Sequence, residues 1–212
     1  MDGHAGPALS RIDGDRRRVL AASATLFAHD GFDGTTMATI AHESGLSLKA
    51  LYAAFPSKEE LFEAVIADRY ELHVLPLLQV DRAALPVAER VFSLLDDVVA
   101  AMEFDRAFLL LYRRGSVAVP AKLRAAGRDP YMPYLDAFRS HLTRAIAACR
   151  PDVDTQTVDD LAVSVTATLV ALACSAFCSE PLRRSAQVSA TLREIFGPAL
   201  GVRSVPTPTH EE

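Results

Sequence analysis

Cations and hydroxyl groups gather near the start of this sequence, where their types suit binding to a polyanion. A basic run at positions 16–18 is followed by Lys49, Tyr52 and Lys58. Lysine and arginine neutralise phosphate charge, and hydroxyl groups donate hydrogen bonds to phosphate oxygens. The chemistry that these residues first suggest is contact with a nucleic-acid backbone. The plainer alternative is a solvated, charged surface.

The elements that would position these residues are short helices with recognisable starts. Within the stretch TTMATIAHESGLSLKALYAAFPSKEEL, Thr36 and Ser47 each have the character of an N-cap. Gly45 lies between the two helices, where a tight turn with a positive φ favours glycine. Two short helices joined by such a turn predict a helix-turn-helix over residues 36–55, whose second helix enters the major groove of DNA.

A third helix start follows at once and carries a cation in an unusual place. Ser57 and Glu60 have the spacing of a capping box, so a helix is expected to begin there. Lys58 then lies in the first turn, where the helix dipole disfavours a positive charge. A bound phosphate would contact both the amine and the free backbone amides of that helix end. A solvated lysine that tolerates a small cost is the alternative.

The order of these motifs resembles the TetR family of bacterial transcriptional regulators. The run TTMATIA..SGLS...LY..F.SKEEL, after a helix that ends LFAHDGFDG, carries the resemblance, which covers roughly residues 15–65. It implies an all-α protein with a three-helix N-terminal head that contains the helix-turn-helix. It also implies a larger helical C-terminal domain that binds a small effector and forms dimers.

The DNA-facing residues follow from the packing of the second helix and from the resemblance. Leu51 and Phe55 must point inward if the motif packs, and Lys49 is then the outward residue able to donate strongly to guanine. The resemblance implies backbone contacts for Tyr52 and Lys58. The expected DNA-binding residues are Arg16, Arg17, Thr36, Ser47, Leu48, Lys49, Ala50, Tyr52, Ala53 and Lys58.

Beyond this head the pattern of apolar residues stays helical, without sustained strand-like alternation. We expect a flexible arm over residues 1–12 and a DNA-binding domain over 13–75. A ligand-binding and dimerisation domain would occupy 76–202, and a disordered, proline-containing tail 203–212.

The stretch 161–178 contains no charged residue, which raises the alternatives of a membrane span and a helix buried on all sides. Its many alanines, with serines and threonines among them, and its lack of an aromatic belt favour burial. Burial of such a helix in a small protein usually requires a partner chain. We therefore predict a homodimer through two helices, at about 155–180 and 182–197, and no membrane insertion.

An effector pocket is predicted from polar and aromatic residues on otherwise apolar faces. Each of them could instead be a core or solvated side chain, but together they suit a small hydrophobic or anionic effector. The candidates are Tyr112, Arg113, Tyr131, Tyr134, His141 and Thr168.

Composition limits the classes of function. The 212 residues carry a formal net charge of -5, so any DNA contact must come from a local basic patch. Cys174 and Cys178 indicate buried thiols in a reducing cytosol, with a redox or metal site as the alternative. The sequence shows no secretory signal peptide, nucleophile–base set, metal-ligand spacing or glycine-rich phosphate loop. We expect a cytoplasmic protein without catalytic residues, metal or cofactor, which is not an enzyme.

The predicted function is a ligand-responsive, sequence-specific regulator of transcription. As a dimer it would bind a palindromic operator in double-stranded DNA, act as a repressor, and be released by a small effector. The alternative is a helical regulator that binds DNA constitutively, without an effector.

Overall fold

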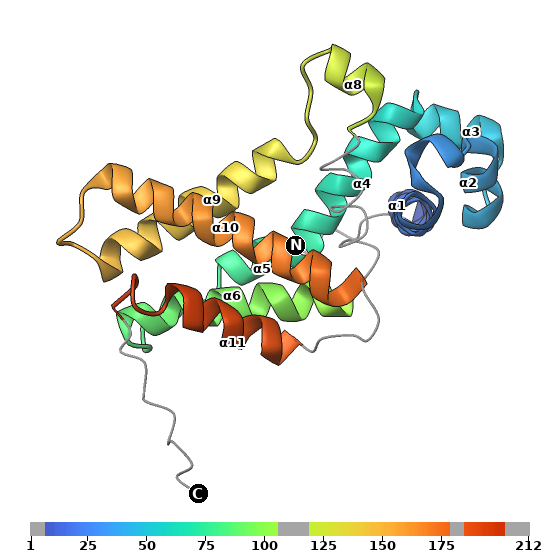
Figure 1. The fold of residues 1–212 in the computed structure, drawn as a ribbon. Helices are drawn as coiled ribbons and strands as arrows, with labels where there is room; N and C mark the ends of the chain where they lie inside the picture. The colour runs from blue at the N-terminus through green and yellow to red at the C-terminus, as the bar shows by residue number, and fades with distance from the viewer. Residues whose placement is uncertain (1–6, 106–118, 179–184, 202–212) are drawn as a thin grey trace, which may run out of the picture. The chain divides into compact units, whose positions relative to one another are not determined.

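The computed structural model describes residues 7–105, 119–178 and 185–201, and these contain helices and no β-strand (Figure 1). The all-α class predicted from the sequence is confirmed. The helices are α1 (Pro7–Gly34), α2 (Met37–Ser44), α3 (Leu48–Ala54), α4 (Lys58–His73), α5 (Leu75–Leu78), α6 (Val87–Phe104), α8 (Ala121–Ala125), α9 (Met132–Cys149), α10 (Thr155–Cys178) and α11 (Ser185–Phe196).

The chain forms two compact units. The first comprises residues 1–72 and 105–133, and the second comprises 73–104 and 134–212. The sequence placed residues 119–133 in the ligand-binding domain, whereas in the structure they belong to the same unit as the helix-turn-helix. The tail 203–212 lies outside the described residues. Which functions the two units carry stays a prediction.

In the first unit, α1 begins earlier than the sequence suggested. We expected a flexible arm up to residue 12, but the helix starts at Pro7. Proline at the first position of a helix loses no hydrogen bond and has a suitable φ, which explains why the helix can begin there. Near the other end of α1, Gly31 has a φ of 78° and interrupts the helical geometry.

The predicted caps of the helix-turn-helix are present. The Thr36 hydroxyl accepts a hydrogen bond from the amide of Thr39 at 3.1 Å, and the Ser47 hydroxyl accepts one from Ala50 at 3.2 Å. Gly45 ends α2 in the left-handed region, with a φ of 71°. These contacts fix where α2 and α3 begin, so the chain reverses over a few residues between them.

The inner side of the motif is a small apolar core. Leu51 and Phe55 are buried, as predicted, and Ile40 of α2 is buried with them. Behind them lies an aromatic cluster in which the ring centroids of Phe27 and Phe32 are 5.7 Å apart, and Phe62 of α4 meets both rings edge-on. The helix-turn-helix therefore packs on α1 through α2, and the aromatic cluster joins α1 to α4.

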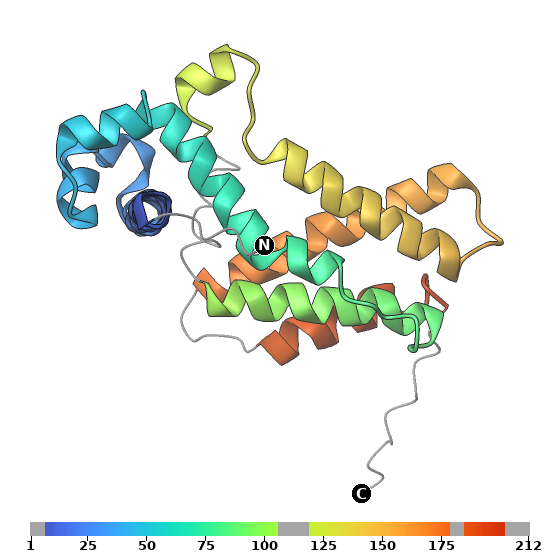
Figure 2. The same cartoon turned by 180° about the vertical axis from the view of Figure 1, so that it is seen from behind.

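The second unit is a helical body in which α6 and α11 lie side by side, with α10 packed against both (Figures 1 and 2). One buried stripe of α10 faces this core, through Val158, Ala162, Val165 and Leu169. Arg193 links α11 to α6, because its guanidinium pairs with Glu89 at 2.9 Å and with Asp96.

The body also contains a long apolar helix that is largely uncovered. By length and composition, Thr155–Ala173 of α10 could cross a membrane, a property that core helices of soluble proteins share. Only 28% of this window is buried within the chain. Its exposed positions include Val163 and the small residues Ser164, Ala167 and Ala171. The sequence predicted that this helix is buried on all sides. Within one chain, however, the face of α10 that carries these exposed residues has no cover.

Candidate nucleic-acid interface

The outward face of α3 carries the side chains that the sequence assigned to DNA. Leu48 and Tyr52 are 43% and 47% exposed, although both are large and partly apolar. Lys49, Ala50 and Ala53 are exposed beside them. A helix of this kind, anchored by Leu51 on its inner side, presents one row of side chains to a partner. The row combines one cationic donor, one phenol and short apolar groups.

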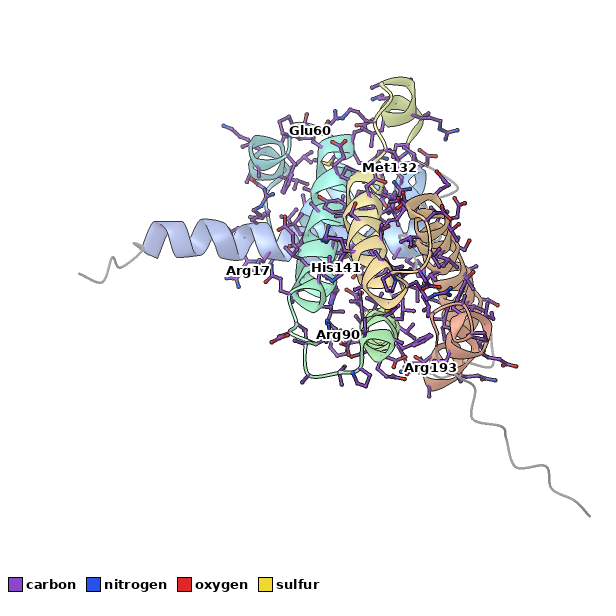
Figure 3. All side chains as sticks on the ribbon, turned by 90° about the vertical axis from the view of Figure 1, so that its left-hand side faces the viewer. Arg17, Glu60, Arg90, Met132, His141 and Arg193 are labelled. Carbon is purple, nitrogen blue, oxygen red and sulfur yellow. The ribbon has the colours of Figure 1, made fainter. Side chains whose placement is uncertain are left out.

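The expected phosphate contacts of α1 lie on the same unit. Arg16 and Arg17 are both exposed, and Figure 3 shows Arg17 on α1. The guanidinium carbon of Arg16 lies 4.9 Å from the ring centroid of Phe55, the residue that caps the end of α3. A cation above an aromatic face is attracted by the ring, so this contact favours one position of the Arg16 side chain. The expected phosphate contact of Arg16 stays a prediction.

The third arginine of the basic run forms an ion pair within α1. Arg18 pairs with Asp15 through a contact of 2.5 Å between its Nη2 and the carboxylate Oδ1. Because the pair is one turn apart on an exposed face, it offsets the local positive charge and contributes little stability. The expected DNA contacts of Arg16 and Arg17 stay a prediction.

Lys58 occupies a place that the sequence did not predict. Its Nζ donates hydrogen bonds to the carbonyl oxygens of Phe32 at 2.7 Å and Thr35 at 2.9 Å. It also lies 4.3 Å from the centroid of the Phe32 ring. The expected phosphate contact stays a prediction, but two of the three N–H donors of the amine already have partners in the protein.

Sequence reasoning missed this cage because its partners lie 26 and 23 residues away from Lys58. No helical or turn spacing connects such distant positions. The one available signal was the cation itself, since a lysine in the first turn of a helix needs a compensating partner. The position of this lysine indicated a bound phosphate as one compensating partner, but it did not reveal the carbonyls of Phe32 and Thr35.

The residues predicted for the effector pocket do not form one described site. Tyr112 and Arg113 lie outside the described residues. Tyr131 belongs to the first unit, where it is 4% exposed and meets the Phe62 ring edge-on at a centroid distance of 6.3 Å. Its ring thus extends the aromatic cluster that supports the helix-turn-helix.

The other three candidates, Tyr134, His141 and Thr168, belong to the second unit and are half-buried. Burial lowers the pKa of His141, and the charges of Arg144 and Arg82 lower it further. A neutral imidazole at ordinary pH suits a partly apolar environment. Their assignment to an effector site stays a prediction.

A groove that the sequence analysis did not identify lies on the second unit. It has a volume of about 450 Å³ and runs between α9 and α10. Its walls present polar and apolar surface in equal measure and are formed by Arg139, Ser140, Thr143, Gln156, Asp159, Asp160 and Val163. The spacing of these residues by three and four along each helix would have allowed the face to be found. None of the four predicted pocket residues that the structure describes lines this groove.

Two further features of the body bear on its chemistry. The thiol of Cys149 donates to the carbonyl of Val87 at a distance of 3.2 Å, and burial raises its pKa, so it is a poor nucleophile. Among the described residues, no group of three or more His, Cys, Asp or Glu side chains is arranged to hold a metal ion. The side chains of Cys174 and Cys178 are not among those described.

Comparison with known proteins agrees with this geometry. The sequence profile of the family described as "Bacterial regulatory proteins, tetR family" matches residues 19–65. The HTH-type transcriptional repressor BdcR of Escherichia coli (strain K12) is 32% identical over 93 residues, which cover 42% of this chain and 47% of that protein. The matched part thus spans about half the length of this curated relative.

The fold extends the likeness over most of the chain. A transcriptional regulator from Rhodococcus sp. Rha1 has a TM-score of 0.72 at 20% identity, covering 91% of this chain and 99% of its own. The regulator FadR from Bacillus subtilis, in complex with stearoyl-CoA, has a TM-score of 0.69 at 10% identity, covering 84% and 96%. Residues 19–65 thus resemble the tetR family of bacterial regulatory proteins, and the rest of the chain shares the fold of these two regulators.

Proposed function

We propose that this protein is a sequence-specific DNA-binding regulator of transcription that acts from the cytoplasm as a repressor. The observation that carries the proposal is the exposed row on α3, with Leu48, Lys49 and Tyr52 facing outward while Leu51 is locked inward. A capped helix that presents a cation, a phenol and apolar groups has the size and chemistry to enter a major groove. The likeness to the repressor BdcR supports the direction of control.

The DNA-binding role is tested by selection from a random duplex library. The purified full-length chain should enrich a palindromic sequence, and fluorescence anisotropy should then show tighter binding to that duplex than to a shuffled duplex of equal composition. The specificity ratio expected is about a thousandfold or more at physiological salt. The proposal would be refuted if the selection enriched no sequence, or if the enriched duplex and its shuffled counterpart were bound with equal affinity.

We propose that the protein binds its operator as a homodimer through α10 and α11. The support is the open face of α10, where small residues such as Ala167 and Ala171 would let a second helix approach closely. Ile195 of α11 is 50% exposed and would add apolar area. One head offers a small footprint, whereas a two-fold pair reads two half-sites about one helical turn, roughly 34–36 Å, apart. Light scattering in solution tests the stoichiometry.

We propose that a small hydrophobic or anionic effector releases the protein from DNA. The likeness of fold to FadR, whose structure contains stearoyl-CoA, supports a body of the kind that holds a ligand. An effector changes operator affinity only if it binds the two conformations unequally, and about 1–3 kcal/mol of coupling is typical. A thermal-shift screen, with release of the selected duplex as the second readout, tests this.

The alternative is constitutive DNA binding. It would be favoured if a broad library of fatty acyl compounds and other small molecules shifted neither the unfolding temperature nor the operator affinity. An enzymatic function is not proposed, because the likeness to the repressor BdcR gives no support for one.

A further inference from the structure

The amine of Lys58 sits in a cage built from the end of α1. Two carbonyl oxygens, those of Phe32 and Thr35, accept its hydrogen bonds at 2.7 and 2.9 Å. The face of the Phe32 ring lies against the amine at 4.3 Å from the centroid. The contacts are part-buried, and all three residues belong to the first compact unit. The cage is thus a defined feature of the unit that contains the helix-turn-helix.

The position of the amine is explained by α1 as much as by α4. At the first residue of α4, a cation is disfavoured by the dipole of its own helix. The carbonyl of Phe32, by contrast, follows the break at Gly31 and also accepts a hydrogen bond from the amide of Thr35 at 3.4 Å. The two carbonyl oxygens of Phe32 and Thr35 therefore offset the unfavourable position of the Lys58 amine at the start of α4.

The cage fixes the connection that leads into the helix-turn-helix. Thr35 is 1% exposed, and its hydroxyl donates to the carbonyl of Gly31 at 2.8 Å. The next residue, Thr36, is the N-cap of α2. Lys58 thus holds the carbonyl of the residue directly before the start of α2. Any shift of that peptide changes the direction in which α2 and the helix after it leave α1.

The aromatic wall of the cage is itself held in place. The Phe32 ring is stacked with Phe27 and meets Phe62 of α4 edge-on at 5.4 Å. The amine therefore binds to a ring that cannot move away easily, and the cation–π contact adds to the two hydrogen bonds. Three elements, α1, the turn into α2, and α4, meet at one ammonium group.

We propose that Lys58 is a positioning residue for sequence recognition, which sets the orientation of α2 and α3 through the turn from Phe32 to Thr35. This role differs from that of a phosphate ligand, and it rests on the proposed DNA-binding function. A phosphate ligand contributes equally to all duplexes, whereas a residue that orients the reading helix contributes most where base edges must be matched.

The test compares three variants of the full-length protein. Lys58→Met keeps the aliphatic stem but removes the three donors and the charge. Lys58→Arg keeps the charge but replaces the compact ammonium with a planar group that does not fit the same cage. Lys122→Met is the matched control, since Lys122 lies in the same unit and its amine pairs with Glu59 at 3.1 Å while the side chain is mostly exposed. Circular dichroism establishes that each variant is folded.

Binding is measured by anisotropy over a series of salt concentrations, with the duplex enriched by the wild-type protein and its shuffled counterpart. For Lys58→Met we expect about tenfold weaker binding to the enriched duplex, comparable to the loss of one base contact. Binding to the shuffled duplex should change by about twofold at most, and the slope of log K against log salt should stay constant. Lys58→Arg should lose discrimination in the same direction, and Lys122→Met should match the wild type.

The opposite pattern would overturn the proposal. If Lys58→Met weakens both duplexes by one factor and lowers the salt slope by about one, Lys58 is a phosphate ligand. If Lys58→Met loses thermal stability but keeps the wild-type ratio of affinities well below its unfolding temperature, its role is stability alone. Either result excludes a positioning role.

A measurement without DNA separates this inference from the proposed function. Hydrogen exchange of the amides at 35–37 should be faster in Lys58→Met than in the wild type and unchanged in Lys122→Met. Unchanged exchange in Lys58→Met overturns the positioning role. If Lys58→Met does not fold, Lys58→Arg is measured in its place by the same criterion. If the wild type enriches no duplex, the proposed function fails while the exchange result still decides what Lys58 does to the turn.

Discussion

Two helical faces of this molecule are open, and they differ in the size of their side chains. On α3 the exposed row includes Leu48, Lys49 and Tyr52, which are long enough to reach into a groove. On α10 the exposed positions include Ala167 and Ala171, which leave the backbone close to the surface. Both faces are uncovered within one chain. The size of their side chains indicates different partners, a duplex for the first and another helix for the second.

The inner sides of the two helices explain why they tolerate exposure differently. Helix α3 is short, and Leu51 is its buried residue. Helix α10 buries a full stripe along its length and still leaves most of its apolar window uncovered. A short helix with one anchor can serve as a reading element on a small domain. A long helix with two apolar sides gains most from a second protein surface.

The largest effect is expected when the buried anchor of α3 is removed. Leu51→Ala deletes a side chain that is fully buried, which should lower the free energy of unfolding of the first unit by about 2–5 kcal/mol. Binding to every duplex should fall as the head unfolds. Urea unfolding and anisotropy measure both effects, with Ala125→Ser at an exposed position of α8 as the control. Normal DNA binding by Leu51→Ala would show that α3 does not read DNA.

A charge placed on the open face of α10 tests the proposed dimer interface. Ala167→Glu should bring two carboxylates together across the proposed dimer interface and produce monomers in light scattering. Because the two heads then bind independently, affinity for the enriched duplex should fall by about a hundredfold. The control is Ala147→Glu, at an exposed position of α9. A dimer that survives Ala167→Glu would place the interface elsewhere.

A substitution of Lys49 tests whether α3 discriminates between base pairs. Lys49→Ala should reduce discrimination by about 1–3 kcal/mol at one or two base pairs of the enriched duplex, since it removes the strongest base-edge donor on this face. Binding to shuffled DNA should change far less. Anisotropy with a set of single-base variants of the duplex shows which positions lose their preference. A uniform loss over all sequences would instead make Lys49 a phosphate contact.

Beneath the proposed dimer face, Arg193 links α11 to α6. Its guanidinium lies over the ring of Phe92 at 4.8 Å and pairs with two carboxylates, which raises its pKa against the opposing effect of burial. Arg193→Met should lower the free energy of unfolding by about 1 kcal/mol, because these contacts are partly exposed. Urea unfolding measures this change. Arg144 is a more exposed arginine of α9. An equal loss of unfolding free energy in Arg144→Met would mean that the effect does not come from the contacts between Arg193 and α6.

The smallest expected effect is a pH dependence of the second unit. Burial lowers the pKa of His141 below its ordinary value of 6.5, so the unfolded chain binds the proton more readily than the folded one. The contribution of His141 to stability is therefore complete above about pH 6.5 and is lost as the pH falls through the folded pKa. His141→Gln should flatten the fall in stability between neutral and mildly acidic pH. An unchanged slope would assign the dependence to other groups.

The head could be predicted closely because its signals are local. Thr36, Gly45 and Ser47 act on backbone groups within four residues, so a single sequence reveals the caps and the turn between them. The packing of Leu51 then follows from helical spacing. The cage around Lys58 could not be predicted, because it depends on carbonyls more than twenty residues away.

The body was less predictable for a related reason. Helices such as α6, α9 and α10 follow from apolar spacing, but a pocket depends on which helices meet and in what rotation. Tyr131 illustrates the point, because its spacing from Tyr134 suggested a shared cavity wall. In the structure the Tyr131 ring instead meets Phe62 in the unit that carries the helix-turn-helix.

The edge-on contact between Tyr131 and Phe62 has a practical consequence for spectroscopy. The chain contains no tryptophan and five tyrosines, so its intrinsic ultraviolet emission comes from phenols alone. Replacing Phe62 with tryptophan would create a single indole fluorophore within the aromatic support of the reading domain. Its emission wavelength would then report, in real time and without any external dye, whether that support stays dry when an operator or an effector is added.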